Sequence, residues 1–231
     1  MPRTTARKST NLPAQKGPSK PNPGKRVRYK ANSAPKTPKP AIYQKGDQTI
    51  ITFSEFVCPV IGNTTLNVHT LHINPGDREL FTWLCKLAIN FEFWMPLKFA
   101  VRYVPYVSHI VNGDLISYAD YDPKDETADS VREMLNNSTS KAIRVCEKKT
   151  WSLDLSSMKT PVAWHLVRNA EDWSIPDVNM YDAGTFNWAA TTDVNNQFVG
   201  RIFVDYTIAF KTPQTNHIDD VGILEYRLQP T

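Results

Sequence analysis

Acidic residues are missing from the first 46 residues of this 231-residue chain. Twelve of the 27 Lys and Arg residues lie in that segment, whereas all 23 Asp and Glu residues follow it, beginning with Asp47. The formal net charge of +4 therefore combines a segment of charge +12 with a body that holds 15 cations against 23 carboxylates. A long cationic segment on an acidic body indicates a polyanionic partner that only the segment should contact.

Cysteine and glycine are also scarce. Cys58, Cys85 and Cys146 are far apart and form no C-x-x-C pair, which argues against thiolate zinc sites and redox motifs. We expect three buried, reduced thiols and synthesis inside a cell. The nine glycines form no phosphate-binding loop, so nucleotide-dependent enzymes are disfavoured.

Long apolar runs are absent as well. The richest apolar stretch, residues 80–107, is interrupted by four charged residues, so we expect no transmembrane helix and no membrane partner. The N-terminus is charged but carries no apolar core, so we expect no secretory signal.

The sequence also lacks the motifs of a catalytic site. His69 and His72, three residues apart on a predicted strand, should lie on opposite faces and so cannot share a metal ion. No nucleophile motif is present. We therefore expect no enzyme.

The basic segment also holds eight of the 17 prolines. Such a composition cannot bury enough apolar surface to offset backbone ordering, so we expect residues 1–47 to form a disordered, extended arm. The run at 25–30 places four cations around Tyr29, which suits phosphate contact with base stacking. We expect RNA binding without sequence preference, although a solvated tail or a nuclear localisation signal is an alternative. The candidate RNA-binding residues are Arg3, Arg7, Lys8, Lys16, Lys20, Lys25, Arg26, Arg28, Lys30, Lys36, Lys39 and Lys45.

Alternating apolar and polar residues dominate after Thr49 and predict about eight strands. The three clearest lie at 97–103, 185–190 and 201–211, and the shorter ones at 49–57, 66–73, 114–120, 142–147 and 163–167. Two short helices compete with these strands. One begins near Pro75 and carries an apolar face at Leu80, Trp83, Leu84, Leu87 and Ala88. The other is capped by Thr127, with Val131, Met134 and Leu135 on its apolar face. This pattern predicts an all-β, eight-stranded, two-sheet sandwich, with a jelly roll as the leading topology.

Three carboxylates are grouped after the strand predicted at 114–120. Asp120, Asp122 and Asp125 form the pattern D-x-D-x-x-D at the start of a loop. Such hard oxygen ligands suit Ca²⁺, which takes six to eight of them, so further ligands would have to come from the backbone, water or a neighbouring chain. A polar turn in which aspartates cap backbone groups is the alternative.

Several segments, in order, resemble the coat proteins of small icosahedral plant viruses of the sobemovirus and tombusvirus type. Their shell domain is a jelly roll. The matching segments read FTWLCKLA at 81–88, YVP at 103–105, GDLISY at 113–118, DYDPKD at 120–125, AGTF at 183–186, VGRIFVDY at 199–206 and KTPQ at 211–214. The chain departs from the tombusvirus type because it ends 18 residues after Pro213, so we expect no protruding second domain. Its arm is also rich in lysine and proline rather than arginine.

The resemblance implies that residues 48–231 form a jelly-roll shell domain. It further implies a capsid protein, not an enzyme, that self-assembles into an icosahedral shell around single-stranded RNA and resides in the virion and the host cytoplasm. In that family such aspartates bind Ca²⁺ between subunits, which makes Asp122 and Asp125 the first candidate ligands and Asp120 the second. Two other functions stay open. One is a monomeric β-sandwich carbohydrate-binding module with exposed tryptophans and a basic tail, and the other is an enzyme on a jelly-roll scaffold.

Overall fold

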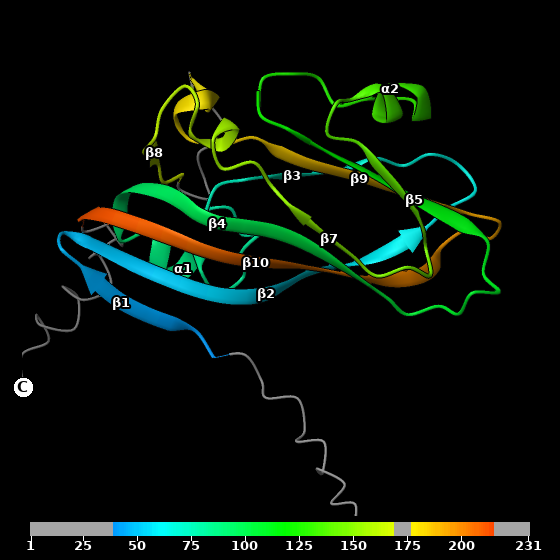
Figure 1. The fold of residues 1–231 in the computed structure, drawn as a ribbon, viewed down its shortest axis with the longest axis horizontal. Helices are drawn as coiled ribbons and strands as arrows, with labels where there is room; N and C mark the ends of the chain where they lie inside the picture. The colour runs from blue at the N-terminus through cyan, green and yellow to red at the C-terminus, as the bar shows by residue number, and fades with distance from the viewer. Residues whose placement is uncertain (1–38, 169–176, 215–231) are drawn as a thin grey trace, which may run out of the picture. The chain divides into compact units, whose positions relative to one another are not determined.

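Two antiparallel sheets pack face to face in the computed structural model, which describes residues 39–168 and 177–214. The first sheet has the order β1 (Ala41–Lys45), β2 (Gln48–Gly62), β10 (Gln197–Pro213), β4 (Phe91–Pro105) and β7 (Lys149–Ser152), and β8 (His165–Leu166) also pairs with β4. The second has the order β3 (His69–His72), β9 (Thr185–Thr192), β5 (Gly113–Asp120) and β6 (Lys141–Arg144). In Figure 1 the first sheet lies below the second, and helix α2 (Val131–Asn136) lies above the second.

The strand order is that of a jelly roll. Strands β2, β10, β4 and β7 of one sheet face strands β3, β9, β5 and β6 of the other, so strands from the two ends of the sequence become neighbours. Strand β10, for example, pairs along most of its length with both β2 and β4. The predicted all-β sandwich is therefore confirmed.

The core lies between the sheets and follows the predicted alternation. On β10, Ile202, Val204 and Tyr206 are at most 1% exposed and point between the sheets. The residues between them, Phe203 and Asp205, are only partly buried, because they stand on the outer face of the first sheet.

All of the predicted strands are present, but their lengths differ from the prediction. Strands β2 and β4 are longer than predicted, and β3 and β8 are shorter. Strand β7 was not predicted, because Trp151 is the only apolar residue among its four residues and no alternation can be recognised. The eighth strand of the sandwich is thus β7, whereas the predicted strand at 163–167 is the two-residue β8 on a side branch.

Strand β1 lies within the segment predicted as a disordered arm, so that prediction is wrong for residues 41–45. The strand pairs with β2 through a tight turn in which Lys45 faces Gln48. Gly46 in this turn has φ 63°, a backbone conformation that glycine adopts without strain. All five β1 residues are exposed, which shows that backbone pairing rather than burial holds the strand. Residues 1–38 lie outside the described residues.

The first predicted helix is reduced to α1 (Cys85–Ala88). Before α1, a helical hydrogen bond runs from the Phe81 N–H to the Asp77 carbonyl, and the helical pattern is then interrupted. The N–H groups of Trp83 and Leu84 donate to the carboxylate of Glu55 on β2 instead of to the preceding turn. The predicted apolar residues Leu80, Leu84 and Ala88 are nevertheless buried.

The second predicted helix is α2, but its cap differs from the prediction. Ser130, not Thr127, is the N-cap, and its hydroxyl accepts from the Glu133 N–H. The Thr127 hydroxyl instead bonds to that of Thr70. Only Met134 of the predicted apolar face is buried, because the six-residue helix contacts the sheet with one turn.

The cysteines are free thiols, as predicted, but only two are fully buried. Cys85 and Cys146 are buried, whereas Cys58 on β2 is partly exposed. Partial burial still raises the pKa of the Cys58 thiol to about 11, which keeps it protonated and unreactive at neutral pH. Among the described residues, no helix is long and apolar enough to cross a membrane.

Candidate functional site

The acidic loop, defined as Asp120 to Asp125, begins at the last residue of β5. The Asp120 carboxylate accepts a hydrogen bond from the Asp122 N–H at 3.0 Å, and the Asp122 carboxylate accepts one from the Lys124 N–H at 3.1 Å. The Asp125 N–H donates to the Asp122 carbonyl at 3.1 Å. The loop is therefore a series of aspartate-capped turns, the alternative to a metal site that the sequence left open.

The carboxylate of Asp120 nevertheless senses its two neighbours. Burial raises the pKa of Asp120, and the charges of Asp125 and Asp122 raise it further. The Asp122 N–H opposes this shift by stabilising the ionised form. Within residues 39–168 and 177–214, no group of three or more His, Cys, Asp or Glu side chains is arranged to hold a metal ion. One chain thus offers part of a ligand set at most, and a metal here would need oxygen ligands from elsewhere.

Tyr121 and Lys124 anchor the acidic loop to two other segments of the chain. The hydroxyl of Tyr121 accepts from the Asp154 N–H at 2.8 Å. The Asp154 carboxylate accepts three hydrogen bonds from Ser156 and Ser157, which lower its pKa to about 2. Lys124 forms an exposed ion pair with Asp177, with 2.9 Å between Nζ and Oδ1. Asp154 is therefore an ionised carboxylate next to the acidic loop, which the sequence did not single out.

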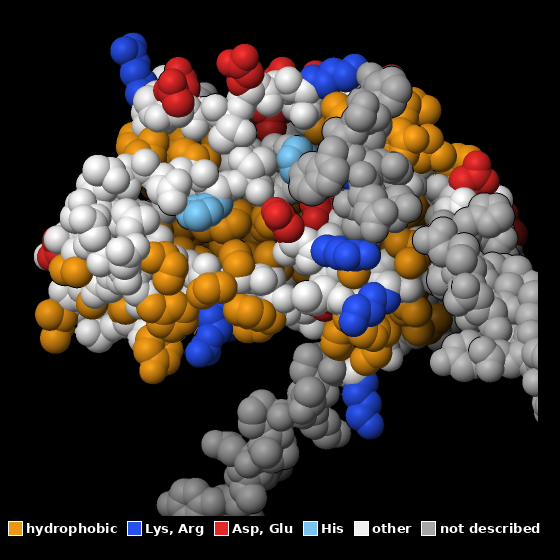
Figure 2. Space-filling view, turned by 180° about the vertical axis from the view of Figure 1, so that it is seen from behind, with side chains coloured by type: hydrophobic (Ala, Val, Ile, Leu, Met, Phe, Trp, Pro, Cys, Tyr) orange, Lys and Arg blue, Asp and Glu red, His pale blue; other side chains and the backbone are white. Residues whose placement is uncertain are grey.

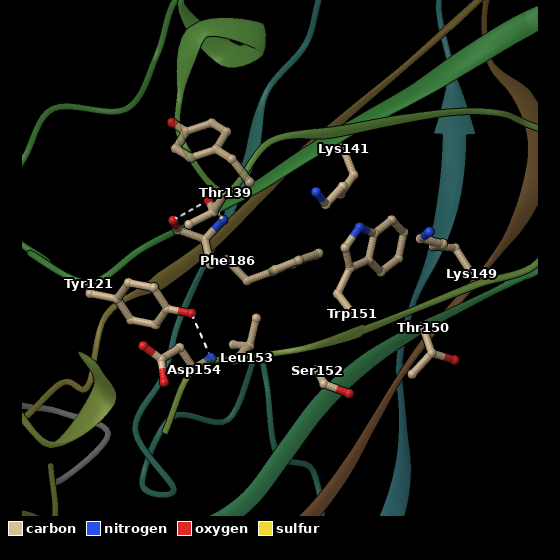
Figure 3. Close-up of a pocket in the computed structure, with 12 residues that line it drawn as sticks. Tyr121, Thr139, Lys141, Lys149, Thr150, Trp151, Ser152, Leu153, Asp154 and Phe186 are labelled. Atoms are coloured by element: carbon tan, nitrogen blue, oxygen red, sulfur yellow. Dashed lines mark hydrogen bonds between the residues drawn. The ribbon is translucent and has the colours of Figure 1, made fainter. Parts of the chain in front are cut away.

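A pocket of about 360 Å³ opens beside this loop, between β6 of one sheet and β7 of the other. Phe186, Trp151 and Leu153 line it, and in Figure 3 Lys141 and Lys149 lie on either side of Trp151. The described residues that line it include no histidine or cysteine.

The five tryptophans of the described residues are not arranged as a sugar-binding platform. Trp94, Trp151 and Trp188 are buried in the core, and Trp83 and Trp164 are partly buried. In the part of the chain that the structure describes, no tryptophan is among the exposed large apolar residues. The described residues therefore provide no exposed tryptophan for the carbohydrate-binding alternative, and Trp173 lies outside them.

Two of the twelve predicted RNA-binding cations lie in the described part of the chain. Lys39 and Lys45 are both exposed, and Lys45 is the last residue of the edge strand β1. The other ten lie outside the described residues, namely Arg3, Arg7, Lys8, Lys16, Lys20, Lys25, Arg26, Arg28, Lys30 and Lys36.

Comparison with known proteins places the fold among virus coat proteins. A family model described as viral coat protein (S domain) matches residues 26–216. The capsid protein of Cucumber necrosis virus is 28% identical over 166 residues, covering 68% of this chain and 41% of that protein. The capsid protein of Tomato bushy stunt virus (strain Cherry) is 29% identical over 188 residues, covering 75% and 46%. The chain thus spans less than half the length of these two relatives.

Solved structures agree with the sequence comparisons. The crystal structure of Cucumber necrosis virus superimposes with a TM-score of 0.70 at 25% identity, covering 79% of this chain and 57% of that chain. Tobacco necrosis virus superimposes with a TM-score of 0.67 at 17% identity, covering 79% of this chain and 90% of that chain, a similarity that concerns the fold.

Proposed function

Because the chain belongs to the viral coat protein (S domain) family, we propose that it is a capsid protein whose copies assemble into a closed icosahedral shell. The observation that carries this proposal is the family match over residues 26–216, which spans the whole jelly roll, a six-stranded sheet packed on a four-stranded one. A closed shell requires the same chain to pack repeatedly around rotation axes, and it needs no catalytic site. The protein is accordingly structural, and its location is the virion.

We further propose that the basic arm packages single-stranded RNA inside this shell. The support is the charge pattern, since twelve cations precede the first carboxylate of the chain. Each phosphate that a cation neutralises releases a counterion, so binding should weaken steeply as salt rises. The described end of the arm, from Lys39, leads directly into β1 at the edge of the first sheet.

This proposal is tested on the full chain by comparing charge-neutralised variants. Replacement of Lys25, Arg26, Arg28 and Lys30 by glutamine should reduce the slope of log affinity for single-stranded RNA against log salt by about 3. The matched control replaces four exposed body cations by glutamine, namely Lys86, Arg132, Lys141 and Lys148, and should leave the slope unchanged. Equal slopes for the two variants would show that the arm does not bind RNA. Electron microscopy of the same preparations tests shell formation.

The acidic loop leads to a separate proposal about assembly. We propose that Asp122 and Asp125, with Asp120 as a further ligand, bind Ca²⁺ together with oxygen atoms of a second copy. The support is the proximity of three carboxylates, since the charges of Asp125 and Asp122 add to the burial that raises the pKa of Asp120, combined with the incomplete ligand set of one chain. A bound Ca²⁺ would offset this negative charge where two copies meet.

Chelation of assembled particles tests the calcium proposal. At neutral pH a chelator should lower the sedimentation coefficient of parent particles and expose their RNA to nuclease. Particles with Asp122→Asn and Asp125→Asn have lost both ligands and repulsion, so they should not respond to the chelator. Asp193→Asn, in an exposed turn away from the loop, is the control and should respond like the parent. Parent particles that are unchanged by chelation would refute the calcium proposal without affecting the capsid assignment.

A further inference from the structure

Aromatic rings are exposed on the outer face of the first sheet, where alternation would place polar residues. Phe56 on β2 and Phe203 on β10 pack edge to face with 5.7 Å between ring centroids, and Phe56 is 46% exposed. Nearby, Tyr106 and Phe198 pack with 5.1 Å between centroids, and Tyr106 is 67% exposed. Two pairs of rings thus keep large apolar areas in contact with water, which the fold itself does not need.

Guanidinium groups lie over both pairs of rings. The Arg102 guanidinium carbon is 4.7 Å from the Phe203 centroid, and that of Arg201 is 5.5 Å from Tyr106 and 5.6 Å from Phe198. Arg102 is held in place by Asp205, with 2.9 Å between Nε and Oδ2. Arg201 is exposed and forms no ion pair with any carboxylate of the described residues, so its charge is available to a ligand.

Strand register brings these side chains together on one face. Phe203 lies opposite Phe56 on one neighbouring strand and opposite Arg102 on the other. Arg201 is two residues from Phe203 along β10 and therefore shares its face. We call the group of Phe56, Arg102, Tyr106, Phe198, Arg201 and Phe203 the stacking face.

The stacking face is basic although the body is acidic. Lys98 lies opposite Thr207 on the same outer face. Three cations, Lys98, Arg102 and Arg201, therefore outnumber the carboxylate of Asp205 there. In Figure 2 hydrophobic and cationic side chains are mixed along the lower margin, whereas acidic side chains gather mostly in the upper half. The same sheet carries β1, the strand that follows the basic arm.

We propose that the stacking face is a second contact site for single-stranded RNA, separate from the arm. Exposed rings provide stacking platforms for unpaired bases, and neighbouring cations contact the phosphates between them. Every base has a flat aromatic surface, so this contact has little sequence preference. A second protein copy is the competing occupant, but Arg201 without a carboxylate partner favours a polyanion. This inference rests on the proposed packaging of RNA by the shell.

Photochemical cross-linking of full-chain particles that contain 4-thiouridine RNA tests the proposal. We expect mass spectrometry to find RNA adducts on peptides that contain Tyr106 or residues 198–203, in addition to adducts on the arm. The double variant Phe56→Ser and Tyr106→Ser should lose the adducts on the sheet and bind RNA about tenfold more weakly. The control Leu135→Ser and Val194→Ser removes two exposed apolar side chains elsewhere and should match the parent.

A single substitution separates charge from stacking. Arg201→Gln should lower the slope of log affinity against log salt by about 0.7, the value for one phosphate contact on a single strand. Adducts confined to residues 1–47, with parent affinity in the double variant, would overturn the stacking face as an RNA site while packaging by the arm stands. Absence of adducts anywhere would overturn the packaging proposal as well. If the double variant binds RNA as the parent does but fails to form particles, the face mediates contacts between copies, and the proposal is equally overturned.

Discussion

The carboxylate of Glu55 should be one of the main stabilising groups of this fold, although it is almost completely buried. Glu55 is 4% exposed and lies on β2, facing the segment before α1. One carboxylate oxygen accepts from the Tyr206 hydroxyl at 2.6 Å and from the Leu84 N–H at 3.2 Å. The other accepts from the Trp83 N–H at 2.6 Å. Glu55 thereby ties two strands and the start of α1 together.

The expected energies follow from the number of hydrogen bonds that each variant loses. Tyr206→Phe removes one hydrogen bond to a charged acceptor and should lower the free energy of unfolding by about 1.5–3 kcal/mol. Glu55→Gln keeps one acceptor oxygen but turns an amide toward donors, so the expected loss is about 2–5 kcal/mol. Because both substitutions break the same contact, the double variant should lose less than the two single losses combined.

Guanidinium-induced unfolding of dissociated subunits, with thermal melting as a second measurement, checks these values. In a domain of this size each 1 kcal/mol corresponds to about 2–4 °C in Tm. Tyr43→Phe is the matched control, because Tyr43 is 50% exposed on the edge strand and should change the free energy of unfolding by less than about 0.5 kcal/mol. If Tyr206→Phe is as neutral as this control, the Glu55 network does not stabilise the fold as argued.

Two further predictions concern stability. Burial lowers the pKa of His165, whose Nε2–H donates to the Met158 carbonyl. As the pH falls, the unfolded chain therefore binds a proton at this histidine at a higher pH than the folded chain does. The free energy of unfolding should therefore fall as pH drops below about 6.5, and His165→Gln should flatten this dependence in denaturant titrations at several pH values. A Cβ at Gly76 would overlap the Arg168 carbonyl, so Gly76→Ala should cost about 3 kcal/mol or more. Gly46→Ala meets no atom within 4 Å and should cost only the strain of its positive φ, about 1 kcal/mol, in the same unfolding assay.

The sheets could be predicted from the sequence because period-two alternation records which face of a strand is buried. On β10, Ile202, Val204 and Tyr206 are buried as predicted. Helix α1 could not be predicted in the same way. Its apolar spacing is helical, but the N–H groups of Trp83 and Leu84 donate to the carboxylate of Glu55 on β2. A contact between residues so far apart in the sequence cannot be recognised from a local pattern.

The candidate sites differ in how much of each could be predicted from the sequence. The acidic loop is contiguous, so Asp120, Asp122 and Asp125 could be grouped from their spacing in the sequence alone. Their aspartate-capped turns were the stated alternative to a metal site, whereas the neighbouring Asp154 depends on the fold and was not predicted. The stacking face is still less visible, because Phe56 and Phe203 become neighbours only through the pairing of β2 with β10.

The two proposed RNA contacts and the acidic loop together constrain how a subunit should sit in the shell. The arm enters at β1 and the stacking face covers the outside of the same sheet, so RNA contact at both requires the first sheet to face the shell interior. The acidic loop instead follows β5 of the second sheet, next to the open edge between the sheets. Calcium removal there would act on contacts between copies and leave the RNA-binding groups intact. Chelation should accordingly swell particles while RNA stays bound, and release of RNA should require raised salt in addition.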